Sequence, residues 1–353
     1  MNDPTVPRCS GFARSEDLDP AGTAGSYQGY VAVDVPLPWP RELTEHPDVA
    51  AAAPALAAAG LRVQGIVLDP ASSSEPRRMV TFLRPDGPFH RYRTAVWTVP
   101  GTGVGEALSA VAVAGAAGAV AGPARRADAG APGATDSEPL DAGGTPGATG
   151  TGASDAGPVA RVATLVAEGD AAGRHVLVCT HGARDACCGS LGTRLATVLP
   201  GLGAGVHVWR TSHTGGHRFA PTALLLPEGT AWAYLDLDTL VGIADRSLDI
   251  GEAARRYRGC AGLDGPEVQA ADREALRAVG WSWLDHHRSG TVVERSVAGA
   301  RIRLDGIAPD GSRTSFEATV EVARLVPVPD CGKPVSEARK SRPELRVREF
   351  AAA

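Results

Sequence analysis

The sequence has almost no lysine. Its only two are Lys333 and Lys340, so arginine supplies nearly all of the positive charge. The formal net charge is −5, and the chain therefore lacks the basic excess that general nucleic-acid binding normally requires. Because the sequence is also rich in alanine and glycine, we attribute the arginine bias to genome composition. We expect no nucleic-acid partner.

The sequence also lacks a long apolar segment. The longest apolar run, residues 108–122, is rich in Ala and Gly and is short for a membrane span. Residues 1–20 contain neither the apolar core nor the cleavage pattern of a secretory signal. We therefore expect a soluble cytoplasmic protein with no membrane partner. In that compartment stable disulfides are rare, and clustered cysteines more often bind metals or take part in redox chemistry.

Residues 122–158 lack the apolar side chains of a folded segment. They consist mostly of Ala, Gly, Pro, Thr, Ser and Asp, and such a composition cannot bury enough apolar surface to offset the entropy cost of ordering. We predict a flexible linker here. It separates a unit at residues 1–121 from a unit at residues 159–290.

The two units share one order of expected elements, β-α-β-β-β-α. The hairpin turns PDG and PEG, within FLRPDGPFHRY and LLLPEGTAWAY, stand at the same step of each unit. This order is typical of a mixed sheet covered by helices, in a thioredoxin-like layout. We predict an α/β fold, of the mixed-sheet α+β kind, with two related thioredoxin-like units.

The C-terminal part continues with helical segments, of which residues 266–279 end at Gly280, a typical helix C-cap. RIRLDGI and TSFEATVEV flank the turn PDGS and predict a β-hairpin extension within residues 291–335. The charged tail at residues 336–353 is expected to have no regular structure.

The chemistry concentrates in two short stretches. In CTHGARDACCG, Cys179 ends an expected strand, and Cys187 and Cys188 begin an expected helix. After the next strand, HTGGH places His213 and His217 four positions apart. A strand end, a helix start and the following loop can meet at one end of a sheet, which predicts two sulfurs and two imidazoles at one site.

The residues alone leave several kinds of site open. A disulfide between the neighbours Cys187 and Cys188 would be strained. A thiol-exchange pair gains from a helix N-terminus, which lowers a thiol pKa, but the usual Cys-x-x-Cys spacing is absent and the histidines stay unused. A Cys2His2 zinc site fits the ligand count. So does a [2Fe–2S] cluster with two cysteines on one iron and two histidines on the other.

The run CTHGARDACCG, followed by VWRTSHTGGHRFAPTALLLP, resembles the sucrase/ferredoxin-like family. RCSGFAR, GTA at residues 22–24, the PW of PLPWP, YRGCAGL and GWSW also resemble that family. Its members are regarded as thioredoxin-like [2Fe–2S] ferredoxins. The resemblance therefore implies an electron carrier, rather than a self-contained enzyme, that works with a redox partner protein, a reductase or an acceptor.

The resemblance also implies the ligands of the cluster, which would be Cys179, Cys188, His213 and His217. Five residues would lie beside these ligands: His181, Cys187, Gly215, Gly216 and Arg218. Cys187 would be a buried helix-start thiol or a substitute ligand. The two glycines would let the backbone pass close to the cluster. Arg218 would stabilise the added electron or be an ordinary solvated arginine.

Several expectations concern the surroundings of this site. Two imidazole ligands raise the potential of a cluster relative to four thiolates and allow electron transfer to be coupled to proton transfer. Arg184 and Asp185 can pair and hold the loop between the cysteines. Cys9, Cys260 and Cys331 are isolated in the sequence, and we interpret them as small buried residues. The first unit has no cysteine at the matching strand and is expected to serve as a scaffold or docking unit.

Two other functions remain in competition with electron transfer. One is a structural Cys2His2 zinc-binding module, and the other is a thiol-redox protein using Cys187 and Cys188. A hydrolase, which the family name suggests, would need two acidic residues at a fixed separation across a sugar site. No such pair stands out in the sequence.

Overall fold

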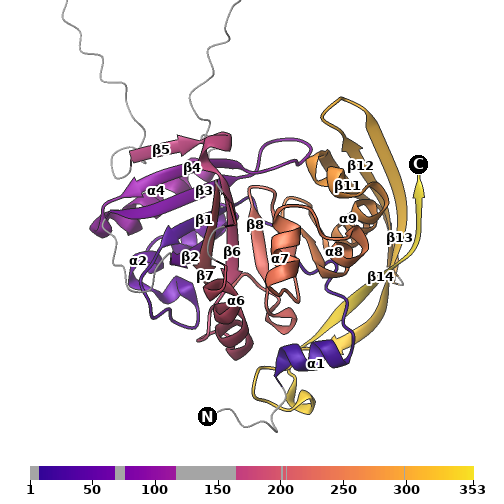
Figure 1. Cartoon of the computed structure of the whole chain (residues 1–353), viewed down its shortest axis with the longest axis horizontal. Helices are drawn as coiled ribbons and strands as arrows, with labels where there is room; N and C mark the ends of the chain where they lie inside the picture. Colours follow the sequence, from indigo (N-terminus) through magenta and orange to yellow (C-terminus); the bar gives the residue numbers. More distant parts are fainter. Residues whose placement is uncertain (1–7, 68–75, 117–163, 200–201, 204, 298) are drawn as a thin grey trace, which may run out of the picture.

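The computed structural model contains two β-sheets with helices packed on them (Figure 1). It describes residues 8–67, 76–116, 164–199, 202–203, 205–297 and 299–353. The linker expected at residues 122–158 lies outside the described residues.

The first unit has the expected element order. Its strands and helices are β1 (Gly29–Asp34), α2 (Pro47–Ala50), α3 (Ala53–Ala58), β2 (Leu61–Val67), β3 (Arg77–Leu83), β4 (Arg93–Val99) and α4 (Val104–Ala116). The sequence GYVAVD of β1 is buried along almost its whole length, as expected for a central strand that is covered on both faces.

The second unit repeats this order. It contains β6 (Arg174–Cys179), a π-helical turn η4 (Cys188–Gly192), α6 (Thr193–Thr197), β7 (Val206–Thr211), β8 (Ala223–Leu226), β9 (Thr230–Trp232) and α7 (Leu237–Ala244). Helix α7 begins at a capping box in which the Asp236 carboxylate and the Thr239 backbone and side chain satisfy one another.

The two units share one ten-stranded sheet, in the order β10-β9-β8-β6-β7-β2-β1-β3-β4-β5. Within each unit the first two strands are parallel and the others antiparallel. The units meet where β2 and β7 pair antiparallel. The strands β5 (Thr164–Glu168) and β10 (Tyr257–Cys260) extend the two outer edges. The predicted mixed α/β fold is confirmed, and the two units have the same internal strand order.

The C-terminal part forms a separate antiparallel sheet. After α8 (Ile250–Arg256) and α9 (Pro266–Val279), Gly280 ends α9 with a φ of 86°, which confirms the predicted cap. The sheet follows in the order β11 (His287–Arg295), β12 (Gly299–Ile307), β13 (Arg313–Pro327) and β14 (Ser341–Ala352). Strands β12 and β13 are the predicted hairpin, and α9 lies against the sheet (Figure 1).

The prediction that the tail has no regular structure is wrong. Strand β14 pairs with β13 from Phe316↔Ala352 to Pro327↔Ser341. The tail is charged because alternate side chains of this strand face solvent, whereas Leu345 on the other face is buried. The alternation of apolar and charged residues in ELRVREF was the sequence signal for this strand.

The remaining elements are short. Helix α1 (Cys9–Ser15) packs against the turn η5 (His217–Phe219). The other single turns are η1 (Leu43–Glu45), η2 (Gly101–Gly103), η3 (Gly169–Ala172), η6 (Trp281–Asp285) and η7 (Val335–Glu337). Among the described residues, no helix has the length and apolar character needed to cross a membrane.

Candidate metal centre

The first part of the site lies at the carboxyl ends of β6 and β7. These strands are parallel, and Cys179 at the end of β6 is opposite Thr211 at the end of β7. The loop after β7 therefore brings His213 beside Cys179, and the helix start brings Cys188. The possible ligand atoms of Cys179, Cys188 and His213 all lie within 4.8 Å of one another. Three of the four predicted ligands thus converge.

Glycines allow this close approach. A β-carbon at Gly192 would lie 1.9 Å from the carbonyl oxygen of Cys179, and one at Gly189 would lie 2.5 Å from the α-carbon of Gly182. Both positions need the absence of a side chain because backbone, rather than a flexible side chain, is the neighbour. The π-helical turn that begins at Cys188 can therefore pack directly against the end of β6.

The sulfur side of the site is closed and the imidazole side is open. Cys179 and Cys188 are fully buried, whereas His213 and His217 are only half-buried. His213 lines a cavity of about 330 Å³. His217 lines another, of about 490 Å³, together with Lys340 and Arg342. Any exchange between this site and the solvent would therefore occur on the histidine side.

The pKa values of the two buried thiols are shifted in opposite directions. The pKa of Cys179 lies well below its usual value because the Cys188 thiol donates to it and His213 lies beside it. The pKa of Cys188 is raised in turn by the adjacent Cys179 thiolate and by burial. A cation at this position would compensate the charge of both sulfurs.

His217, the fourth predicted ligand, is turned partly away from the other three. Its ring lies 6.0 Å from that of His213, and its Nδ1 lies 3.0 Å from Oδ2 of Asp185. The expected pairing of Arg184 with Asp185 is wrong. Arg184 pairs instead with Glu42 at the surface, because Asp185 is buried and points inward.

His181 has partners on both ring nitrogens. Its Nε2 lies 2.8 Å from the carbonyl oxygen of Pro40, and its Nδ1 accepts a 3.2 Å hydrogen bond from the backbone N–H of His213. Burial lowers its pKa, which favours the neutral ring that this pattern requires. His181 therefore lies beside the site and positions His213.

Of the two glycines between the histidines, Gly216 makes room for an arginine. Gly215 and Gly216 have φ values of 84° and 69°. A β-carbon at Gly216 would lie 2.5 Å from the guanidinium of Arg258. Arg258 is fully buried and donates to the carbonyl oxygens of Thr23 and Gly215, at 2.6 and 3.2 Å. Arg218 is also buried, with its guanidinium over the Phe219 ring, so the interpretation as a solvated arginine is wrong.

The first unit supports the histidine loop, which fits the expected scaffold role. Arg62 on β2 donates a 2.6 Å hydrogen bond to the carbonyl oxygen of His213. The backbones of Gly65 and Ser212 are joined by a 2.9 Å hydrogen bond, and the Ser212 hydroxyl accepts one of 3.0 Å from the Gly65 N–H. The β2–β7 junction therefore holds this loop.

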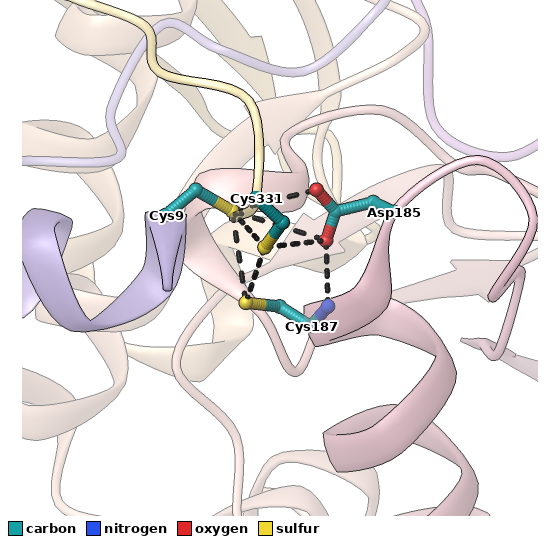
Figure 2. Close-up of side chains that lie close together, drawn as sticks. All are labelled: Cys9, Asp185, Cys187 and Cys331. Carbon is teal, nitrogen blue, oxygen red and sulfur yellow. Dashed lines mark hydrogen bonds between the residues drawn. The ribbon is translucent and has the colours of Figure 1, made fainter. Parts of the chain in front are cut away.

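A second group of ligand-type side chains, not predicted from the sequence, lies next to the first (Figure 2). It contains Cys9 of α1, Asp185 and Cys187 from the loop and turn after β6, and Cys331 between β13 and β14. The Sγ–Sγ distances are 3.7 Å for Cys9–Cys187, 3.2 Å for Cys9–Cys331 and 2.9 Å for Cys187–Cys331. Cys9 is buried, as expected, and Cys331 is half-buried, but neither is isolated in the fold.

Cys260 fits the original interpretation. It is fully buried and its thiol donates at 3.6 Å to the carbonyl oxygen of Glu228. Cys187 and Cys188, although adjacent, contact different partners: Cys187 faces Cys9 and Cys331, whereas Cys188 faces Cys179. This separation argues against a redox pair made of the two neighbouring thiols.

The sequence was compared with known proteins. A family model described as sucrase/ferredoxin-like matches residues 20–259. The matched range includes both stretches that carry Cys179, Cys188, His213 and His217. Neither the curated proteins nor the solved structures contain a match.

Proposed function

The chain belongs to the sucrase/ferredoxin-like family, and from this membership and the geometry of the site we propose that it is an electron carrier. It would hold a [2Fe–2S] cluster through Cys179, Cys188, His213 and His217. When bound, such a cluster supplies one-electron redox chemistry, at a potential that imidazole ligands raise.

The donor set fits this group. Two fully buried sulfurs and a nearby imidazole lie within 4.8 Å of one another, and a second imidazole follows across the loop, 6.0 Å from the first ring to ring. Because Nδ1 of His217 faces Asp185, its other ring nitrogen is the donor that would take the metal. A carboxylate on the second nitrogen is the usual partner of a metal-bound histidine.

The burial asymmetry is the observation that carries the proposal. Cys179 and Cys188 are fully buried, while both histidines border cavities. A centre that exchanges electrons needs one accessible side, and a purely structural centre does not. The redox partner protein would therefore approach on the histidine side.

The protein around the site has its own roles in this function. Arg258 places a buried positive charge behind the histidine loop, where it favours the reduced, more negative state of the centre. Arg62 and His181 fix His213 through its carbonyl oxygen and its backbone N–H. Because His213 is held in this way, it moves less when the centre gains or loses an electron.

A zinc site at the same four residues is the second candidate, because zinc binds the same sulfur and nitrogen donors. The experiment is iron and acid-labile sulfide analysis of the full-length protein, with electron paramagnetic resonance after reduction by dithionite. We expect iron and sulfide in equal amounts and a signal of the Rieske type. Cys188→Ser should abolish the signal, and Cys260→Ser, at a buried cysteine elsewhere, should leave it unchanged. A colourless protein with zinc alone would refute the proposal.

A further inference from the structure

We propose that Cys9, Cys187, Cys331 and Asp185 bind a zinc ion at a second site. This site adjoins the proposed cluster ligand His217, whose Nδ1 lies 3.3 Å from Cys9 Sγ and 3.0 Å from Asp185 Oδ2. These four residues come from three distant parts of the chain and point toward one another (Figure 2). The proposal does not depend on which metal the neighbouring group holds.

The distances match a four-coordinate metal site that has contracted slightly. Four ligands at the usual zinc–sulfur and zinc–oxygen lengths place sulfurs about 3.8 Å apart and sulfur and oxygen about 3.5 Å apart. Cys9 Sγ lies 3.7 Å from Cys187 Sγ and 3.5 Å from Oδ2 of Asp185. Cys331 Sγ lies 3.7 Å from Oδ1 of Asp185. The Cys331–Cys9 and Cys331–Cys187 pairs, at 3.2 and 2.9 Å, would need to open.

A disulfide accounts for this arrangement less well. Each of the three sulfurs lies within 3.7 Å of both others, so any one disulfide would leave a third thiol against it. A disulfide would also leave unexplained why the Cys9 and Cys331 sulfurs lie 3.5 and 3.7 Å from oxygens of the Asp185 carboxylate. A metal uses all four groups at once.

The charge of the group also calls for a cation. Cys9, Cys187 and Asp185 are buried, and the Cys9 sulfur lies 3.5 Å from the Asp185 carboxylate. A buried thiolate next to a buried carboxylate is costly unless a positive charge compensates it. A divalent ion among the three sulfurs would provide the compensation.

Thiolate-rich sites of this size select zinc among the common divalent metals, since oxygen-preferring metals bind sulfur poorly. The consequence is structural. Zinc would fasten α1 and the loop between β13 and β14 to the turn that carries Cys188, and so would hold these two segments against the cluster site. Metal binding at such a position adds directly to folding stability.

The test is elemental analysis of the full-length protein, purified without added metal and again after incubation with Zn²⁺. We expect about one zinc per chain, in addition to iron. Cys331→Ala should lose the zinc and keep the iron, Cys331→His should keep both because histidine is also a zinc ligand, and Cys260→Ala should match the wild type.

Three outcomes would overturn the inference. One is an iron-loaded wild type that takes up no zinc. Another is a Cys187–Cys331 disulfide found by mass spectrometry of the protein as purified. The last is zinc that persists in Cys331→Ala but disappears in Cys179→Ser. Because iron and zinc are counted separately, loss of this site is distinguishable from failure of the proposed [2Fe–2S] function. If Cys331→Ala does not fold, Cys331→His and the wild type still decide the question.

Discussion

Oδ2 of Asp185 lies 3.0 Å from Nδ1 of His217, and this contact joins the two stretches that carry the candidate ligands. The other oxygen, Oδ1, accepts hydrogen bonds of 2.9 and 3.2 Å from the backbone N–H groups of Cys187 and Cys188. One carboxylate therefore fixes both the helix start that bears Cys188 and the imidazole of His217. Burial opposes the charge of Asp185, but His217 and the backbone N–H of Cys188 lower its pKa to about 2.

Asp185→Asn should weaken the hold on His217 without removing a cluster ligand. The amide is a weaker acceptor and carries no charge, and loss of such a partner typically reduces metal affinity by about 10–100-fold. We expect the cluster absorbance to bleach faster in the presence of a chelator, by a factor in that range. The measurement is the bleaching rate of the visible absorbance.

The matched control for this change is Asp238→Asn, at an exposed aspartate in the first turn of α7. It should bleach at the wild-type rate. Equal rates for Asp185→Asn and the wild type would show that His217 does not depend on Asp185. The zinc content of Asp185→Asn is a separate readout, which reports on the second site.

The convergence of Cys179, Cys188 and His213 could be predicted because it follows from local rules. Two parallel strands end at the same edge of a sheet, so the residues just after them are neighbours whatever the rest of the chain does. The spacing within each stretch and the turns between strands therefore contained the information. The same holds for the common strand order of the two units.

The second group could not be predicted in this way. Cys9 and Cys331 lie 322 positions apart, and no periodicity or turn links them. Cys331 lies in the loop between β13 and β14, and the pairing of β14 with β13 was not expected. From the sequence, Asp185 was expected to pair with its neighbour Arg184. In the structure Asp185 is buried and contacts His217 instead, and a sequence does not display this burial.

Gly215 and Gly216 provide a matched pair of substitutions. At Gly215 an added β-carbon would meet nothing closer than 3.8 Å, whereas at Gly216 it would lie 2.5 Å from Arg258. Gly215→Ala should lower the free energy of unfolding by about 1–2 kcal/mol, the cost of a left-handed conformation for a residue with a side chain. Gly216→Ala should cost more, because the guanidinium of Arg258 must also move.

Urea unfolding of the two glycine variants measures this difference. The reduction potential of each variant in its metal-loaded form is measured as well. A shift in Gly216→Ala but not in Gly215→Ala would show that the displacement of Arg258 affects the metal centre. If the two alanine variants are equally stable, then contact with Arg258 does not explain the glycine at residue 216.

His175 is held as a neutral ring at the far end of β6 from Cys179. Its Nδ1 accepts a 3.0 Å hydrogen bond from Trp209 Nε1, and its Nε2 lies 3.0 Å from the carbonyl oxygen of Ala172. Protonation of Nδ1 would break the bond to Trp209 and would place a charge in a buried site. Burial, together with the neighbouring His207, accordingly lowers the pKa of His175 from 6.5 to about 4.

The lowered pKa of His175 predicts that the protein becomes less stable as the pH falls from 6.5 toward 4. In that range the unfolded chain binds a proton that the folded chain does not, so the free energy of unfolding rises with pH. The share of His175 is at most about 3 kcal/mol, since one pKa unit corresponds to about 1.4 kcal/mol.

His175→Gln keeps an acceptor and a donor but does not titrate. Urea unfolding at pH 5 and pH 7.5 should therefore show a smaller pH dependence in the variant than in the wild type. Some dependence should remain, because the pKa of His90 is also lowered by burial. An unchanged pH dependence would mean that His175 is already protonated in the folded protein, or that the unfolded chain does not bind the extra proton.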